Sequence, residues 1–165
     1  LDVIEAATAE RPTTFPYIPG LLSFREGAVI LDAMRRLATA PDVFIFDGQG
    51  IAHPRRIGIA SHIGLFLEVP TVGCAKSRLS GAHTVPPAAK GSWQPLVDRG
   101  ETIGAVLRTR ANVKPVYVSV GHRTTLDTAR ELVLRCTTRY RLPEPTRAAH
   151  NTAGIAPGSP QLPLL

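Results

Sequence analysis

The chain has 165 residues, of which 44% are hydrophobic and 19% are charged, which is the composition of one globular domain with a single core. No run of 18 apolar residues is present, which excludes an obvious membrane span, and no basic segment followed by an apolar stretch marks a signal peptide at the start. The net charge of +6 and the pI of about 10 leave two interpretations open, an anionic partner such as nucleic acid or a basic surface that only aids solubility.

The first forty residues predict an extended segment, a stiff loop and a helix. We interpret residues 1–9 as the end of a strand. In residues 16–20, two prolines fix their own φ and restrict the residues before them, so the exposed Tyr17 and Ile18 resemble a wedge more than a hinge. Ser23 and Glu26 have capping-box spacing, and apolar residues at helical spacing then predict a helix that ends near residue 40.

The middle of the chain predicts a strand, a helix and a second strand. Residues 43–46 form a short apolar run that is typical of a buried strand, and Asp47 follows at its end. Pro54 fits the first turn of a helix over residues 54–68, and residues 69–75 predict the next strand. Because the connections are short, this βαβ unit implies two parallel strands.

The second half predicts a long polar excursion over residues 76–100, with Trp93 as its one aromatic anchor, and strands over 102–109 and 115–120. Thr124 or Thr125 can cap the following helix, and Thr146 can cap a short last helix. We expect one domain over residues 1–150 and a disordered tail over 151–165, which is rich in Gly, Pro, Ser and Ala. The two cysteines lie far apart in apolar segments, so buried thiols are expected rather than a disulfide.

Three side chains could carry chemistry at one edge of the predicted sheet. A carboxylate at the end of a buried strand, such as Asp47, is costly unless its charge is compensated, and metal coordination is one compensation, although Asp also starts many tight turns. Lys76 follows the neighbouring parallel strand and could contact a phosphate, whereas a lone lysine is more often a solvated surface residue. Glu26 could join Asp47 around Mg²⁺, or serve only as a capping-box carboxylate.

A series of ordered motifs resembles the endonuclease V family. They are Pro16-Tyr17-Ile18-Pro19-Gly20 with Phe24-Arg25-Glu26, Asp47-Gly48-Gln49-Gly50 with His53-Pro54-Arg55, Gly58-Ile59-Ala60-Ser61-His62, Ala75-Lys76-Ser77-Arg78-Leu79, Gly121-His122, and Pro143-Glu144-Pro145-Thr146-Arg147 with His150. The resemblance implies an α/β fold of the ribonuclease H-like class, a mixed β-sheet with flanking helices. Since the chain starts at what matches the family's third strand, we expect the first two strands, and a metal-binding Asp on the first, to be missing.

The resemblance also implies an activity and a set of site residues. The family hydrolyses the second phosphodiester bond on the 3′ side of a deaminated base, chiefly hypoxanthine, in DNA or RNA, and it uses Mg²⁺, for which Mn²⁺ can substitute. By resemblance, the catalytic residues are Glu26, Asp47, Lys76 and His150, and the metal ligands are Glu26, Asp47 and His150. The wedge is formed by Tyr17, Ile18 and Pro19, and the base pocket is lined by Gly48, His53, Gly58 and Ile59.

Three functions remain open from the sequence. The first is a metal-dependent endonuclease for inosine-containing DNA or RNA, which we expect to be a cytoplasmic monomer. The second is a nucleic-acid-binding remnant of the same fold, impaired in catalysis because the first-strand Asp is missing. The third is a structural α/β domain with no role in nucleic-acid binding, in which case no salt-dependent DNA binding would be observed.

Overall fold

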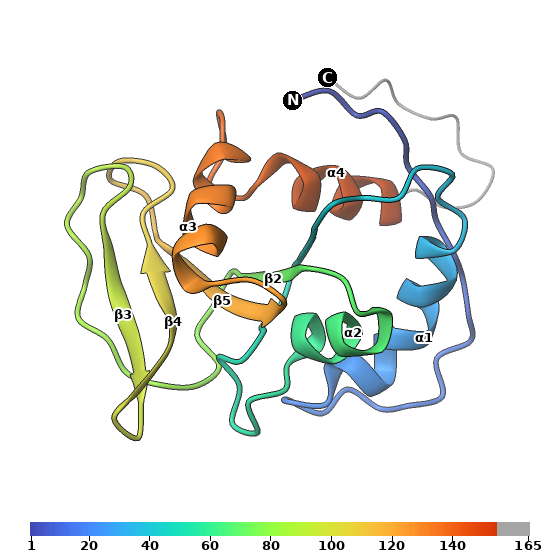
Figure 1. Cartoon of the computed structure of the whole chain (residues 1–165), viewed down its shortest axis with the longest axis horizontal. Helices are drawn as coiled ribbons and strands as arrows, with labels where there is room; N and C mark the ends of the chain where they lie inside the picture. Colours follow the sequence, from blue (N-terminus) through green and yellow to red (C-terminus); the bar gives the residue numbers. More distant parts are fainter. Residues whose placement is uncertain (155–165) are drawn as a thin grey trace.

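The structure, a computed structural model, describes residues 1–154 and contains a five-stranded mixed sheet with four helices (Figure 1). In chain order the elements are α1 (Leu22–Met34), β1 (Phe44–Phe46), α2 (Ile59–Leu67), β2 (Thr71–Ala75), β3 (Trp93–Asp98), β4 (Glu101–Leu107), β5 (Val116–His122), α3 (Leu126–Arg135) and α4 (Glu144–Ala153). The sheet order is β1-β2-β5-β4-β3, in which β1 and β2 are parallel and the other neighbours are antiparallel. The predicted parallel βαβ unit and the α/β class are therefore confirmed.

The sheet separates two apolar layers, because successive strand residues point to opposite faces. On one face, Val72 and Cys74 of β2 pack with Val133 of α3. On the other face, Phe46 of β1 packs with Ile63 of α2, and apolar residues of α1 cover them. Both cysteines are free thiols, as predicted. Cys74 is buried as expected, whereas Cys136 is only partly buried. None of the helices among residues 1–154 combines the length and the apolar character that crossing a membrane requires.

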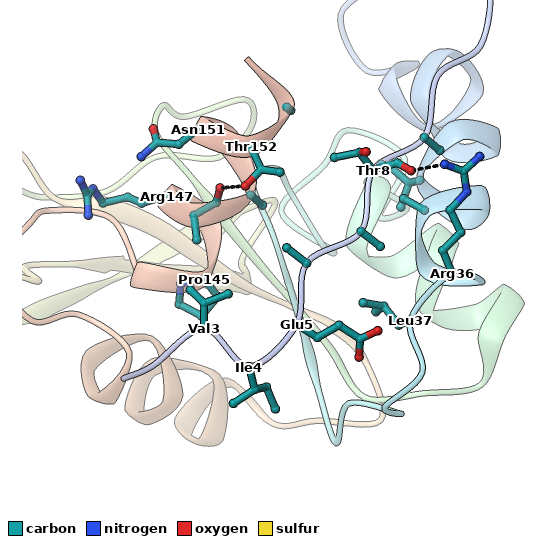
Figure 2. A pocket seen from close by; sticks show the side chains of 18 of the residues that line it. Val3, Ile4, Glu5, Thr8, Arg36, Leu37, Pro145, Arg147, Asn151 and Thr152 are labelled. Carbon is teal, nitrogen blue, oxygen red and sulfur yellow. Dashed lines mark hydrogen bonds between the residues drawn. The ribbon is translucent and has the colours of Figure 1, made fainter. Parts of the chain in front are cut away.

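The N-terminal segment is not a strand, contrary to the prediction, since residues 1–21 belong to no helix or strand. Its polar groups instead tie it to the end of α1. The Glu5 carboxylate accepts hydrogen bonds from the backbone N–H groups of Ala38 and Thr39 at 2.7 and 3.0 Å. The Arg36 guanidinium donates to the Thr8 carbonyl. The segment crosses a groove of about 1320 Å³ between α1 and α4 (Figure 2).

Two helix boundaries differ from the prediction because tertiary contacts override the local pattern. Helix α1 ends at Met34 rather than near residue 40. The backbone N–H groups of Ala38 and Thr39, which a longer helix would have used internally, donate to the Glu5 carboxylate instead. Helix α2 begins at Ile59, so Pro54 lies in the preceding turn and not in the helix. In that turn Arg56 has a left-handed φ of 57°.

Strand β3 and helix α4 also differ from the prediction. The excursion over residues 76–100 contains β3, the edge strand of the sheet, which pairs with β4 and also forms one isolated bridge from Val97 to Ala82. Helix α4 starts at Glu144 with Pro145 in its first turn, and Thr146 donates to the Pro143 carbonyl instead of capping the helix. The helix runs to Ala153, past the predicted start of the tail, and residues 155–165 of that tail lie outside the described residues. By contrast, Thr125 caps α3 as predicted, accepting from the Thr128 N–H at 3.2 Å.

Candidate active site

The parallel pair β1 and β2 places Asp47 beside Lys76. Each residue directly follows its strand, so both side chains leave the sheet at the same edge. The Lys76 ammonium donates to Oδ2 of Asp47 at 2.6 Å. The lysine and aspartate side chains are 42% and 37% exposed, so solvent screens the pair and it contributes little to stability. The predicted juxtaposition is confirmed, and the pair is open to an incoming ligand.

Glu26 faces the same edge from α1. It does not form the predicted capping box: the first residue before α1 is Leu21, no side chain caps the helix, and the Ser23 hydroxyl is within 2.9 Å of Nδ1 of His62 instead. Burial raises the pKa of Glu26, the charge of Arg25 lowers it, and the negative charge of Asp47 raises it. The negative charges of Asp47 and Glu26 therefore act on each other, and a cation held by both carboxylates would relieve that repulsion.

A divalent cation fits these two carboxylates. Mg²⁺ prefers oxygen ligands, retains several waters and is commonly held by one or two carboxylates together with phosphate oxygens of a substrate. Glu26 and Asp47 supply that set, with Lys76 as the present counter-charge of Asp47. Among residues 1–154, no three side chains of His, Cys, Asp or Glu are grouped as a metal site. His150 lies exposed in the last turn of α4, so its part in metal binding stays a prediction.

The glycines after Asp47 allow the loop to lie directly against the sheet and α2. A Cβ atom on Gly50 would lie 1.9 Å from the Val120 carbonyl oxygen of β5. The Gly50 N–H also donates to the Ser119 hydroxyl at 2.8 Å. A Cβ atom on Gly48 would lie 2.6 Å from Cγ2 of Ile59. Gly50 is thus required by the close approach of its backbone to β5.

Of the predicted base-pocket residues, His53 is almost fully buried and its ring has a defined state. Its Nδ1 accepts from the Arg55 N–H at 3.2 Å, so its Nε2 carries the proton that is donated to the Gly20 carbonyl at 3.0 Å. Burial lowers the pKa of His53, in agreement with a neutral ring. His53 thus contacts Gly20 at the end of the predicted wedge loop, whereas Gly48 lies against Ile59.

The wedge residues stand out from the body of the protein. Tyr17 is 70% exposed and Ile18 is 42% exposed, although both are large apolar side chains. Arg25 anchors the approach to this loop by donating to the Phe15 carbonyl at 2.7 Å. A fixed loop that holds apolar side chains in solvent suits contact with a partner. Its role as a wedge stays a prediction.

Sequence reasoning missed two residues that hold the backbone around Lys76. Arg141 donates to the Lys76 carbonyl at 2.6 Å and to the Pro115 carbonyl at 2.7 Å. Gln49 is buried and donates its amide to the Ser77 carbonyl at 2.9 Å. These bonds fix two successive carbonyls after β2 and so restrict where the lysine side chain can go. Gln49 lies within the motif Asp47-Gly48-Gln49-Gly50, which could have marked it as a site residue. Nothing near Arg141 in the sequence indicates a contact with Lys76.

Comparisons with known proteins agree on one family. A sequence model of the family described as Endonuclease V matches residues 1–151. Endonuclease V of Trichormus variabilis is 61% identical over 153 residues, which are 93% of this chain and 69% of the relative. Endonuclease V of Roseiflexus sp. is 58% identical over 149 residues, covering 90% of this chain and 67% of the relative.

Solved structures of the same description share the fold. The crystal structure of the Streptomyces avermitilis endonuclease V matches with a TM-score of 0.81 and 46% identity, covering 85% of this chain and 61% of that chain. Ciona intestinalis endonuclease V, in complex with a 24mer DNA containing an inosine followed by a ribo-adenosine, matches with a TM-score of 0.71 and 27% identity, covering 86% of this chain and 67% of that chain. The chain thus spans between 61% and 69% of the length of these four proteins.

Proposed function

Because the chain belongs to the endonuclease V family, we propose that it is a metal-dependent endonuclease that cuts DNA or RNA near deaminated bases, chiefly hypoxanthine. The observation that carries the proposal is that the charged groups of Glu26, Asp47 and Lys76 act on one another at one edge of the sheet. The exposed Tyr17 loop directly precedes α1, the helix that carries Glu26. The inosine-containing DNA bound to the Ciona relative supports this substrate class. The cleaved bond would be the second phosphodiester on the 3′ side of the lesion.

In the proposed hydrolysis, the residues of the site have different roles. Glu26 and Asp47 would hold Mg²⁺ or Mn²⁺, with His150 as the third predicted ligand. When bound, such an ion activates water and stabilises the leaving oxygen. Lys76 would exchange its contact with Asp47 for a contact with the scissile phosphate, where its charge offsets the negative charge that develops. Arg141 and Gln49 keep the lysine backbone in place during this exchange.

Cleavage of an inosine-containing oligonucleotide with Mg²⁺ tests the proposal. Asp47→Ala and Lys76→Ala should each lower the cleavage rate by ~100-fold or more, since loss of one group that stabilises developing charge commonly costs that much. Glu68→Gln is the matched control, because Glu68 is an exposed carboxylate paired only with Arg123 among the described residues, at 3.6 Å. Equal rates for Asp47→Ala and the control would refute the metal assignment.

A second candidate function is nucleic-acid binding with impaired catalysis. It is favoured by one observation, that residues 1–154 group only two carboxylates, and not three side chains, at the candidate metal site. In that case the chain would bind inosine-containing DNA but would not cut it with Mg²⁺ or Mn²⁺. Cleavage by the wild type that Asp47→Ala abolishes would eliminate this candidate.

The Tyr17 loop provides an independent test of lesion recognition. Tyr17→Ala should lower the preference for inosine-containing over undamaged duplex while leaving metal binding unchanged, because Tyr17 lies outside the carboxylate pair. The preference is measured as the ratio of the two dissociation constants at one salt concentration, since phosphate contacts make both depend on salt. An unchanged ratio would count against the wedge.

A further inference from the structure

A second cavity is lined in part by His53. Its volume is about 410 Å³, and its lining includes Gly20, Phe24, His53 and His62. It shares His53 with the predicted base pocket but includes none of Gly48, Gly58 and Ile59. It is therefore a separate site, and it opens next to the residue that ends the wedge loop, Gly20.

The walls of this cavity suit a flat, neutral ring. The rings of Phe24 and His62 meet edge to face with centroids 5.6 Å apart, and Phe24 is 62% exposed. Ile57 adds an exposed apolar side chain, and His53 presents a neutral ring because both its nitrogens are hydrogen-bonded within the protein. Every nucleobase has an apolar face that stacks on aromatic side chains, with little dependence on sequence.

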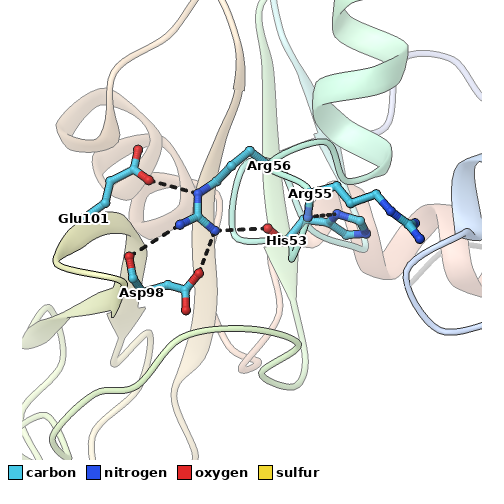
Figure 3. Close-up of polar contacts among 5 residues, drawn as sticks. All are labelled: His53, Arg55, Arg56, Asp98 and Glu101. Carbon is cyan, nitrogen blue, oxygen red and sulfur yellow. Dashed lines mark hydrogen bonds and ion pairs between the residues drawn. The ribbon is translucent and has the colours of Figure 1, made fainter.

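The rim of the cavity carries an uncompensated positive charge. Two adjacent arginines differ in this respect (Figure 3). Arg56 is neutralised by Asp98 at 2.9 Å and Glu101 at 2.9 Å. The Arg55 side chain points away from those carboxylates, lines the cavity, and has no acidic partner among residues 1–154. A guanidinium beside an apolar slot matches a nucleotide, whose base is apolar on its faces and whose phosphate is negative.

We propose that this cavity, which we call the Phe24 cavity, binds the unpaired nucleobase of the complementary strand, the base that loses its partner when the lesion leaves the duplex. The inference rests on the proposed function and deepens it. The Tyr17 loop would separate the two strands, with the lesion on the Asp47 side and the orphaned base in the Phe24 cavity. Stacking there offsets part of the cost of unpairing the duplex.

The test measures the coupling between Phe24 and the base opposite inosine. Affinities of the full chain are measured for two inosine duplexes, one with cytosine opposite the inosine and one with an abasic residue there. Phe24→Ala should weaken binding of the first duplex by roughly 5- to 150-fold, the range that 1–3 kcal/mol of stacking gives, and should leave the second nearly unchanged. Phe66→Ala is the matched control, because Phe66 is 64% exposed on α2 and does not line the cavity.

Two further measurements keep the test decisive. Phe24 also stacks on Phe15 at 6.1 Å, so Phe24→Leu serves as a second variant that keeps apolar volume but lacks the flat ring. It should show the same dependence on the opposite base. In addition, 5-iodouracil opposite the inosine should photo-crosslink to the peptide containing Phe24 or His62, whereas 5-iodouracil beside the inosine in the lesion strand should not.

The possible outcomes separate this inference from the proposed function. Equal weakening of both duplexes by Phe24→Ala, or a crosslink only from the lesion strand, would overturn the Phe24 cavity as the site of the orphaned base. If the lesion preference and its loss in Tyr17→Ala persisted alongside that result, the proposed function would stand. If the chain showed no preference for inosine at all, the proposed function would fail, and this inference with it.

Discussion

The close approach of the Asp47 loop to the sheet gives a quantitative prediction for Gly50→Ala. The added Cβ would lie 1.9 Å from the Val120 oxygen and 2.5 Å from the Val120 carbonyl carbon. Both are backbone atoms of β5, an interior strand, so they cannot turn aside as a flexible side chain can. The loop would have to move by about 1 Å or more to relieve the contact.

That movement would break hydrogen bonds as well as strain the packing. The Gly50 N–H donates to the Ser119 hydroxyl at 2.8 Å, and the Ile51 N–H donates to the Val120 carbonyl at 2.8 Å. Each is worth ~1 kcal/mol, and overpacking adds ~1–3 kcal/mol. We therefore expect Gly50→Ala to lower the free energy of unfolding by about 3–5 kcal/mol, a large part of the ~5–15 kcal/mol of a typical domain.

Urea unfolding measures this change, as a lower midpoint at an unchanged m-value. Gly27→Ala is the matched control, since Gly27 is also buried but lies in α1, where a Cβ would meet only Cδ1 of Ile63 at 3.4 Å. Because alanine favours a helix interior, that control should match the wild type or exceed it by ~0.5–1 kcal/mol. If Gly50→Ala unfolded at the same midpoint as Gly27→Ala, the close approach of the loop to β5 would be refuted.

Three further predictions concern protonation, thiol reactivity and the Lys76 support. Burial holds the pKa of His53 below its usual 6.5, so the unfolded chain binds more protons and the free energy of unfolding should fall as the pH drops below about 6.5. Measured from pH 8 to pH 5, this fall should be steeper in the wild type than in His53→Gln. Parallel curves for the two proteins would contradict the prediction. Burial raises the pKa of Cys74 to about 12, so in the native protein a thiol reagent should modify Cys136 first, and mass spectrometry showing the reverse order would contradict the burial. Arg141→Ala should lower the free energy of unfolding by ~1–3 kcal/mol and lower the cleavage rate, because it removes the side chain that donates to the Lys76 and Pro115 carbonyls. If stability and cleavage fell no further than in the control Arg139→Ala, the proposed role of Arg141 in holding the Lys76 backbone would be contradicted.

The sequence alone determined the elements around Asp47. An apolar run, two glycines and helical periodicity before the next apolar run are local signals, and short connections between them allow only parallel pairing. The cap of α3 at Thr125 was equally readable, because its partner N–H is three residues away. These features needed no knowledge of distant contacts, and some of the motifs that identify the family, such as Asp47-Gly48-Gln49-Gly50, lie on them.

Only the tertiary structure decided the features that depend on distant partners. Strand β3 was missed because Pro95 and a Gly/Pro-rich surrounding argue against a strand. An edge strand tolerates a proline, however, and the isolated bridge that β3 forms away from β4 is at Val97 and not at Pro95. Glu26 matched a capping box, but His62, far along the chain, engages the hydroxyl of Ser23, and no side chain within residues 1–154 forms an ion pair with the Glu26 carboxylate. The helix expected from Pro54 begins only at Ile59, after the turn in which Arg56 meets Asp98 and Glu101.

The candidate site also combines features that local sequence signals predict with features that depend on distant contacts. Asp47 and Lys76 could be paired from the sequence, because parallel strands bring their ends to one edge. The bond from Arg141 to the Lys76 carbonyl joins residues 65 positions apart, and no periodicity or spacing reports such a contact. Local patterns therefore predicted that Asp47 and Lys76 lie together, while long-range packing decided how the Lys76 backbone is held and where the Phe24 cavity lies.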